Sequence, residues 1–248
     1  MKKLLLTCVL LCSTQLCLAL APYMHGTKLA AADLPQQLAL VEKKLTSEGF
    51  TVVGRHTPTG LVGRASLVVT DPGLLDVIHT MSGSAIVGSG IRVAVQADGA
   101  VSYINPDYWY RAYLRGQFKA AQVAVNSVKL RLGKALGVGT DFGGDVPEAD
   151  LANYRYMLGM ERFDSNNSEL KKYASFDEAL KAVQDNLGKG VGSTSRVYEV
   201  VMADSKQAVF GVAMNNASDG EGWWVNKIGA EHMAGLPYEL FIVDNKVF

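Results

Sequence analysis

Two segments of this chain, 142 residues apart, carry the same spacing of apolar residues. In each segment these residues recur at positions i, i+4, i+7 and i+11, which places them on one face of an α-helix. They are Leu34, Leu38, Val41 and Leu45 in the first segment, and Phe176, Leu180, Val183 and Leu187 in the second. Capping signals flank both segments. Asp33 and Gly49 stand at the two ends of the first segment, and the pair Ser175 and Glu178 stands at the start of the second. The sequence therefore predicts helices over 34–47 and 176–187.

Segments typical of β-strands follow both helices in the same order. They are residues 50–53, 61–70 and 91–95 after the first helix, and residues 197–201, 207–214, 223–228 and 238–243 after the second. The last strand of each set leads into a turn dipeptide, Asp98-Gly99 or Asp244-Asn245, which predicts a β-hairpin. These turns lie 146 residues apart, close to the offset of the helices. Two independent features with a similar offset favour two copies of one α+β unit.

The predicted organisation is an α+β chain in four parts. Residues 1–19 are a signal peptide, 20–115 a first α+β unit, 116–167 a helical connector and 168–248 a second α+β unit. In the connector, an Ala-, Val- and Leu-rich helix ends at Gly137, and Pro147 opens a short helix that runs through Tyr154 and Met157. Each unit is expected to be an antiparallel sheet with helices on one face.

Several motifs of the first unit occur in a characteristic order. After the helix come Gly-Phe-Thr-Val-Val at 49–53, Ile-Arg-Val-Ala-Val at 91–95, the turn at 98–99, and Val-Ser-Tyr-Ile-Asn-Pro at 101–106. The second unit shares Pro-Tyr-Glu-Leu at 237–240 and the preceding helix. This order resembles the family called domain of unknown function 302. The resemblance implies two similar units, each a curved antiparallel sheet packed on helices, as in the TATA-binding-protein fold, and it implies no activity. The chain departs from the family pattern in its long connector and in lacking a clear strand before Leu34.

The first twenty residues have the pattern of a secretory signal peptide. Two lysines precede an apolar stretch over 4–20, and small residues stand at Ala19 and Ala21. We expect cleavage after Ala19, because cleavage after Ala21 would leave Pro22 at the new N-terminus. Polar residues interrupt the apolar stretch, which disfavours a membrane anchor of about 20 apolar residues. The sequence thus predicts a periplasmic or secreted protein.

Export would change the composition of the chain. Its cysteines, Cys8, Cys12 and Cys17, all lie in the signal segment, so the exported protein would have neither a disulfide nor a thiolate nucleophile. The full chain has 24 basic and 24 acidic residues, and loss of residues 1–19 removes two lysines and leaves a net charge of −2. We expect no binding of nucleic acid at this charge. Nor do we expect membrane insertion after cleavage, because no second apolar stretch approaches spanning length.

Motifs that would indicate an enzyme are weak in this sequence. It has no G-x-S-x-G, and its glycine-rich segment 188–194 follows a helix, whereas a phosphate-binding loop precedes one. The segment 164–168 alternates oxygen ligands but lacks the glycine and glutamate of a calcium loop. One enzyme hypothesis stays open, a hydrolase in which Asp141, Asp145 and Glu161 converge with a histidine. We expect a non-enzymatic protein in preference to it.

Thioether and imidazole side chains suggest a second hypothesis, a metal or haem site. The candidate ligands are His79, Met81, Met157, Met160 and His232. Such donors suit copper, and methionine also serves as an axial ligand of haem. Covalent haem is excluded because there is no C-x-x-C-H motif. Methionine is also a common gap-filler of protein cores, and packing is the alternative interpretation of the same residues.

A concentration of aromatic and arginine residues supports the leading hypothesis, a ligand-binding groove. The candidate lining residues are Tyr108, Trp109, Arg111, Tyr154, Tyr156 and Met157. Tyrosine and tryptophan bury a large area and offer a polar tip, which suits a small apolar or anionic ligand, or a protein partner. We expect the groove at the junction of the two units, because equivalent surfaces of a duplicated fold meet there.

Overall fold

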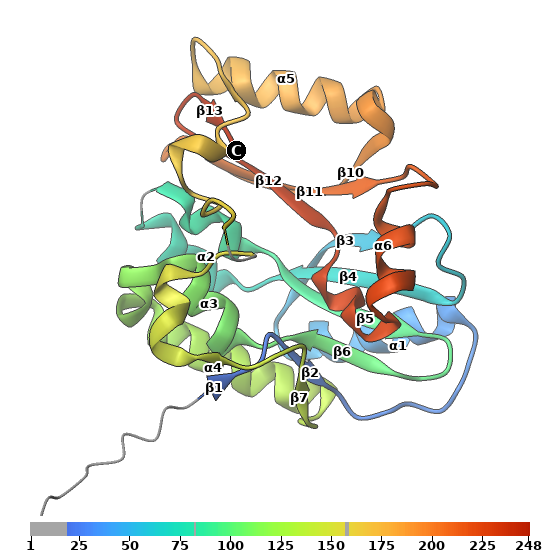
Figure 1. The fold of residues 1–248 in the computed structure, drawn as a ribbon. Coiled ribbons are helices and arrows are strands. Elements are labelled where there is room, and N and C mark those ends of the chain that lie inside the picture. Colours follow the sequence, from blue (N-terminus) through green and yellow to red (C-terminus); the bar gives the residue numbers. More distant parts are fainter. Residues whose placement is uncertain (1–18, 82, 157–158) are drawn as a thin grey trace, which may run out of the picture.

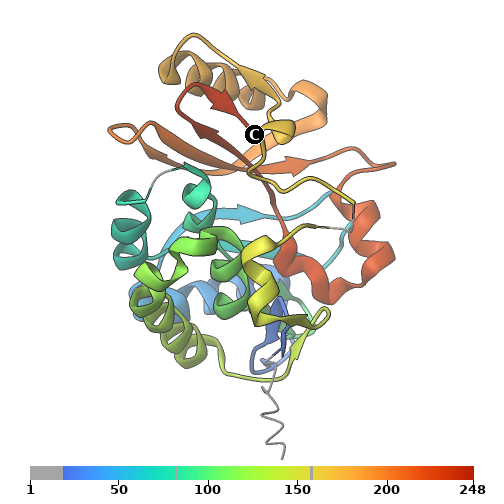
Figure 2. The same ribbon diagram turned by 60° about the vertical axis from the view of Figure 1, so that its left-hand side comes forward.

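The structure is a computed structural model that describes residues 19–248 apart from Ser82, Met157 and Leu158. It is an α+β fold in which two antiparallel sheets pack face to face and helices cover the outer faces, as Figures 1 and 2 show. The predicted signal peptide lies almost wholly outside the described residues. Within them, none of the helices combines the length and hydropathy needed to cross a bilayer.

The first sheet has six strands in the order β3-β4-β5-β6-β2-β7. These are β3 (Thr51–His56), β4 (Arg64–Thr70), β5 (Ile91–Gln96), β6 (Val101–Ile104), β2 (Tyr23–His25) and β7 (Asp141–Phe142). Helix α1 (Leu34–Ser47) covers its outer face with Val41 and Leu45, and Asp33 caps the helix by accepting a 2.8 Å hydrogen bond from the Gln36 amide. The predicted helix over 34–47 is thus confirmed. Strand β2 corrects the expectation that no strand precedes Leu34.

The second sheet has five strands in the order β10-β11-β12-β13-β9. These are β10 (Thr194–Met202), β11 (Gln207–Met214), β12 (Tyr238–Val243), β13 (Lys246–Val247) and β9 (Lys171–Lys172). Helix α5 (Phe176–Gly188) covers its outer face, which confirms the second predicted helix. The Ser175 hydroxyl accepts a 3.1 Å hydrogen bond from the Glu178 amide as expected. The Glu178 carboxylate reaches the amide of Ala174, whereas a capping box would use that of Ser175.

The two sheets share their order of elements. In each, a short strand precedes the first helix, two strands follow it, and a second helix leads through a 3-10 segment to a hairpin. The second helices are α2 (Pro72–His79) and α6 (Glu221–Ile228), and the 3-10 segments are Gly83–Ser89 and Ala230–Gly235. The short early strand, β2 or β9, pairs in both sheets with the last strand of the hairpin. Each 3-10 segment contacts the opposite sheet, so each half covers part of the other.

Five helical segments of the described chain lie between β6 and β9. The longer ones are α3 (Pro106–Leu114), α4 (Phe118–Leu136), which matches the predicted connector helix, and a 3-10 segment (Glu148–Asn153). Two three-residue 3-10 segments lie at Arg115–Gln117 and Asn166–Ser168. The short helix predicted from Pro147 ends at Asn153, before Tyr154. A two-stranded ribbon of β1 (Ala19–Leu20) and β8 (Val146–Pro147) lies beside it.

The prediction of a strand over 223–228 is wrong, because this segment belongs to helix α6. Its aromatic and β-branched residues favour a strand only weakly, and tertiary contacts override such preferences. Here Glu221, Gly222 and Val225 are buried at helical spacing, and Gly222 lies directly against the Thr59 carbonyl. A helix therefore buries this face of the segment.

The layer between the sheets is partly polar. Alternate residues of β11 face opposite ways: Phe210 packs under α5, while Val209 packs toward the first sheet. Arg92 on β5 and Glu239 on β12 meet between the sheets at 2.6 Å, with side chains 4% and 9% exposed. Tyr198 on β10 donates a 3.0 Å hydrogen bond to Glu239. A buried ion pair therefore joins the two halves.

Candidate functional site

A pocket of about 630 Å³ lies where the first sheet, the connector and the second half meet. Its aromatic lining comes from all three parts of the chain. The aromatic residues are Tyr23, Tyr108, Trp109, Tyr154, Tyr156, Trp224 and Tyr238. Apolar residues such as Val146, Ile228 and Leu236 complete the walls, and Asp150, Arg155 and His232 add polar groups.

The structure brings four of the six predicted groove residues together at this pocket: Tyr108, Trp109, Tyr154 and Tyr156. Arg111 does not line it. Its guanidinium pairs with Glu148 at 3.0 Å and lies over the Phe118 ring, 4.2 Å from its centre, because this side of α3 faces the start of α4. Met157 lies outside the described residues.

Helix α3 positions the two aromatic residues on the inner wall. Its capping residue Asn105 accepts a 3.1 Å hydrogen bond from the Asp107 amide, and Pro106 occupies the first turn. The Trp109 indole donates a 2.8 Å hydrogen bond to the Pro22 carbonyl, which ties the ring to the segment before β2. The cap and the proline make this aromatic run a helix.

The aromatic rings of the inner wall pack edge to face. Ring centres lie 5.2 Å apart for Tyr108 and Trp109, 5.6 Å for Trp109 and Tyr154, and 6.0 Å for Tyr108 and Tyr154. Tyr23 stands next to this cluster, 6.3 Å from Trp109 and 5.8 Å from the His232 ring. Such contacts favour a fixed arrangement, so this wall is preorganised.

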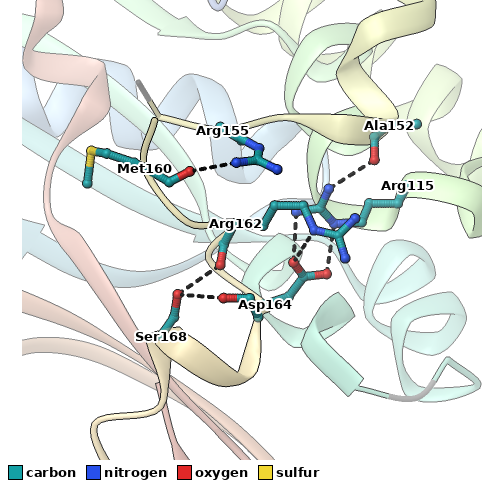
Figure 3. A network of polar contacts seen from close by, with 8 residues as sticks. Arg115, Ala152, Arg155, Met160, Arg162, Asp164 and Ser168 are labelled. Carbon is teal, nitrogen blue, oxygen red and sulfur yellow. Dashed lines mark hydrogen bonds and ion pairs between the residues drawn. The ribbon is translucent and has the colours of Figure 1, made fainter. Parts of the chain in front are cut away.

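The connector is held in place beside the pocket by Arg115, the residue that ends α3 (Figure 3). Its guanidinium donates to the Ala152 carbonyl at 2.9 Å and forms two contacts with the Asp164 carboxylate, at 2.8 and 3.0 Å. Arg155 donates to the Met160 carbonyl at 3.1 Å. Because Tyr154 and Tyr156 lie within the segment anchored at both ends, this network sets the position of the connector wall.

We expect Arg115→Leu to loosen that wall. Leucine can fill the space but cannot bond Ala152 and Asp164, and truncating a partly buried charge pair leaves the Asp164 carboxylate without its main partner. The expected loss is about 1–3 kcal/mol of unfolding free energy, together with faster proteolysis between residues 150 and 165. Limited trypsin digestion and urea denaturation measure both. Lys181→Leu on exposed α5 is the matched control, and equal protection of the connector in the two variants would contradict this role for Arg115.

Burial disfavours the ionisation of four phenols of the pocket. It raises the pKa of Tyr108 to about 12 and raises the pKa of Tyr154 further. It also raises the pKa values of Tyr23 and Tyr238. Neutral phenol hydroxyls both donate and accept hydrogen bonds. The pocket therefore offers convergent, uncharged polar groups on apolar walls.

Tyr23 and Tyr238 were not predicted as lining residues. Tyr23 precedes Tyr108 by 85 residues and reaches the pocket because β2 pairs with β6, in a register that sets Tyr23 opposite Ile104. Tyr238 starts β12 in the second sheet. Only the pairing of distant strands brings them to Trp109, so no local pattern could identify them.

The predicted metal ligands do not form one cluster. The exposed His79 pairs with Asp204 at 2.8 Å, Met81 is buried in the core, and the Met160 side chain is exposed. His232 alone of this set lines the pocket, and Met157 is not described. Among the described residues, no group of three or more His, Cys, Asp or Glu side chains could hold a metal ion. The described members of the predicted copper or haem set are therefore dispersed over the structure.

The carboxylates of the hydrolase hypothesis do not line the pocket either. Asp141 lies on the edge strand β7, and Glu161 accepts a 3.1 Å hydrogen bond from Asn167 in the connector. The carboxylate that does line the pocket is Asp150.

Comparison with known proteins adds no relative to this description. No protein-family model matches the chain, and a search of curated proteins finds no significant match.

Proposed function

We propose that this protein is an exported, non-enzymatic binding protein whose ligand occupies the aromatic pocket at the junction of two related halves. The observation that carries the proposal is the convergence of seven aromatic residues from three distant parts of the chain on one cavity of about 630 Å³. Small-molecule sites are typically apolar clefts of about 300–1,000 Å³ with a few convergent polar groups. The proposal of export rests on the signal-peptide pattern at residues 1–19.

The relation between the halves is supported by a shared irregularity in their strands. β3 has a bulge between Val52 and Gly54, and β10 has one between Arg196 and Tyr198. Each bulge lies in the strand that follows the first helix of its half. The next strands, β4 and β11, pair with their neighbours on both edges in corresponding registers. Bulges of this kind are specific features of a fold. We therefore propose that the halves are two copies of one unit. The proposal includes the TATA-binding-protein-like arrangement of each unit and the kinship to domain of unknown function 302.

When the two halves are aligned on their bulges, residues that contact each other across the halves occupy equivalent positions. Gly54 then corresponds to Tyr198, and a side chain at Gly54 would collide with the Tyr198 Cβ. Arg92, opposite Val68, corresponds to Glu239, opposite Gly211. Contacts between equivalent residues are expected on a local two-fold axis. The buried ion pair would then lie on that axis, and the pocket beside it, where the 3-10 segment Ala230–Gly235 covers the first sheet.

A thermal-shift screen of small molecules tests the binding function. A ligand at a hundred times its Kd should stabilise the protein by about 2.7 kcal/mol, which raises Tm by roughly 5–10 °C for a chain of this size. We expect at least one compound to do this for the wild type and not for Asn153→Trp, which places a bulky ring at the exposed rim of the pocket.

Asn126→Trp is the matched control, because Asn126 is an exposed residue of α4 outside the pocket lining. This variant should keep the full shift. The proposal fails if no compound class stabilises the wild type, or if the shift survives in Asn153→Trp.

A further inference from the structure

The charges around the pocket are neutralised within the protein. Arg92, behind Trp109, is paired with Glu239, and Arg111 is paired with Glu148. The pocket lining includes Asp150 and Arg155, one of each sign and both exposed, and the imidazole of His232, which lies 3.7 Å from the Glu231 carboxylate. Arg155 is bonded to the Met160 carbonyl. An ionised ligand entering this pocket would lose its hydration without gaining a buried counter-charge, which is costly. The pocket therefore favours an uncharged ligand, against the anionic option considered from the sequence.

Five phenol hydroxyls of the pocket have no hydrogen-bond partner among the described residues. Elsewhere, the Tyr103 hydroxyl donates to the Gly137 carbonyl and the Tyr198 hydroxyl to Glu239, whereas the buried Tyr110 hydroxyl has no partner within the described residues. The hydroxyls of the pocket tyrosines have no such bond within the described part of the chain. These five are Tyr23, Tyr108, Tyr154, Tyr156 and Tyr238.

These five tyrosines line one cavity of about 630 Å³, and the rings of Tyr108 and Tyr154 lie 6.0 Å apart between their centres. A flat apolar ligand would displace water from these groups and leave them unpaired, which costs binding energy. A ligand with several hydroxyl groups would pair with them, because a phenol both donates to and accepts from another hydroxyl.

The aromatic walls of the pocket also favour a ligand that has an apolar face. Tyr156 and Trp224 stand at the rim with 71% and 46% of their surface exposed, although large aromatic residues usually gain from burial. The ring of a sugar has apolar C–H faces and hydroxyl groups around its edge. Its faces can cover aromatic rings while its edge meets the phenol hydroxyls.

We propose that the pocket binds an uncharged saccharide. This inference rests on the proposed binding function and specifies its ligand class. Apolar aromatic compounds and charged sugars are the alternatives that the experiment must separate from it.

Isothermal titration calorimetry on the purified protein tests the class with defined probes. Cellobiose, maltose and N,N′-diacetylchitobiose represent neutral saccharides, glucuronic acid and glucosamine their charged counterparts, and indole a flat aromatic ligand. We expect one-to-one binding of at least one neutral disaccharide, with weaker binding of both charged sugars and of indole. Absence of binding by all three neutral disaccharides would overturn the inference.

Single-atom variants test the hydroxyl contacts. Tyr154→Phe and Tyr238→Phe keep the ring and remove the hydroxyl, and each should weaken saccharide binding by about threefold to tenfold, the effect of one lost hydrogen bond. Tyr173→Phe, in the segment before α5 and outside the pocket lining, should bind like the wild type. Unchanged affinity in both pocket variants would contradict the saccharide contacts.

The outcomes also separate this inference from the proposed function. If indole or another compound binds, is blocked by Asn153→Trp and is unaffected by the phenylalanine variants, the binding function stands and the saccharide inference fails. If no probe binds and the thermal-shift screen is also negative, both fail.

Discussion

Replacing Glu239 with alanine is expected to lower the free energy of unfolding by about 3–5 kcal/mol, because it leaves a buried charge without its partner. Arg92 lies between the two sheets with 4% of its side chain exposed, and Glu239 is its acidic partner at 2.6 Å. Within the described residues, its other side-chain hydrogen bond is to the Tyr113 hydroxyl, at 2.8 Å. One neutral acceptor does not compensate a buried guanidinium. Urea denaturation followed by circular dichroism measures the loss.

The double variant Arg92→Met with Glu239→Leu separates the ion pair from the space it fills. Well-packed apolar residues can replace a buried ion pair at little cost, so the double variant should be more stable than Glu239→Ala. Lys181→Ala removes an exposed pair with Asp185 and should change stability by less than about 1 kcal/mol. A Glu239→Ala protein as stable as the Lys181→Ala control would show that the pair is not desolvated as the structure indicates.

Local patterns were sufficient to predict α1 and α5. Each has an apolar face repeated along the helix and a capping side chain within three residues of its start. Helices α2 and α3 carry comparable signals, an Asp71 or Asn105 cap followed by proline, but each is short and its sequence is rich in β-branched or aromatic residues. Short helices depend on tertiary contacts more than on propensity, which explains why they were not predicted.

The candidate site could be predicted only in part for a related reason. Tyr108, Trp109, Tyr154 and Tyr156 form two dense aromatic runs, and density alone suggested a binding surface. Arg111 belongs to the same run, yet the helical geometry of α3 turns it toward α4 and Glu148. If the run were a strand, Arg111 would share a face with Trp109. The choice between helix and strand therefore decided which member of the run lines the pocket.

The contacts between the halves could not be predicted, because they depend on strand register. The bulges in β3 and β10 shift the side-chain alternation that follows them, and a one-residue shift moves a side chain to the opposite face. Tyr198 follows the bulge of β10 and bonds Glu239 between the sheets in the observed register. A sequence pattern identifies the strands but not where such a shift occurs.

Phe210→Ala is expected to destabilise the whole molecule and not the second half alone. Phe210 is fully buried between β11 and α5, and truncating such a side chain costs about 3–5 kcal/mol. Contacts between the halves should make unfolding a single transition: Tyr198 and Phe241 share one core with the first sheet, and the buried His56 and Glu221 meet at 2.5 Å across the halves. A loss of packing in the second half should therefore also destabilise the first half.

A tryptophan in the first half makes this coupling measurable. With Trp223 and Trp224 replaced by phenylalanine, fluorescence reports Trp109 on α3, whereas circular dichroism reports both halves. We expect Phe210→Ala to shift both signals to the same lower urea midpoint. Leu67→Ala, at the position of β4 that corresponds to Phe210, should shift the same single transition by about 2–5 kcal/mol. If Trp109 kept its original midpoint while circular dichroism showed an earlier loss, the halves would unfold separately. The pocket could then not depend on both of them for its shape.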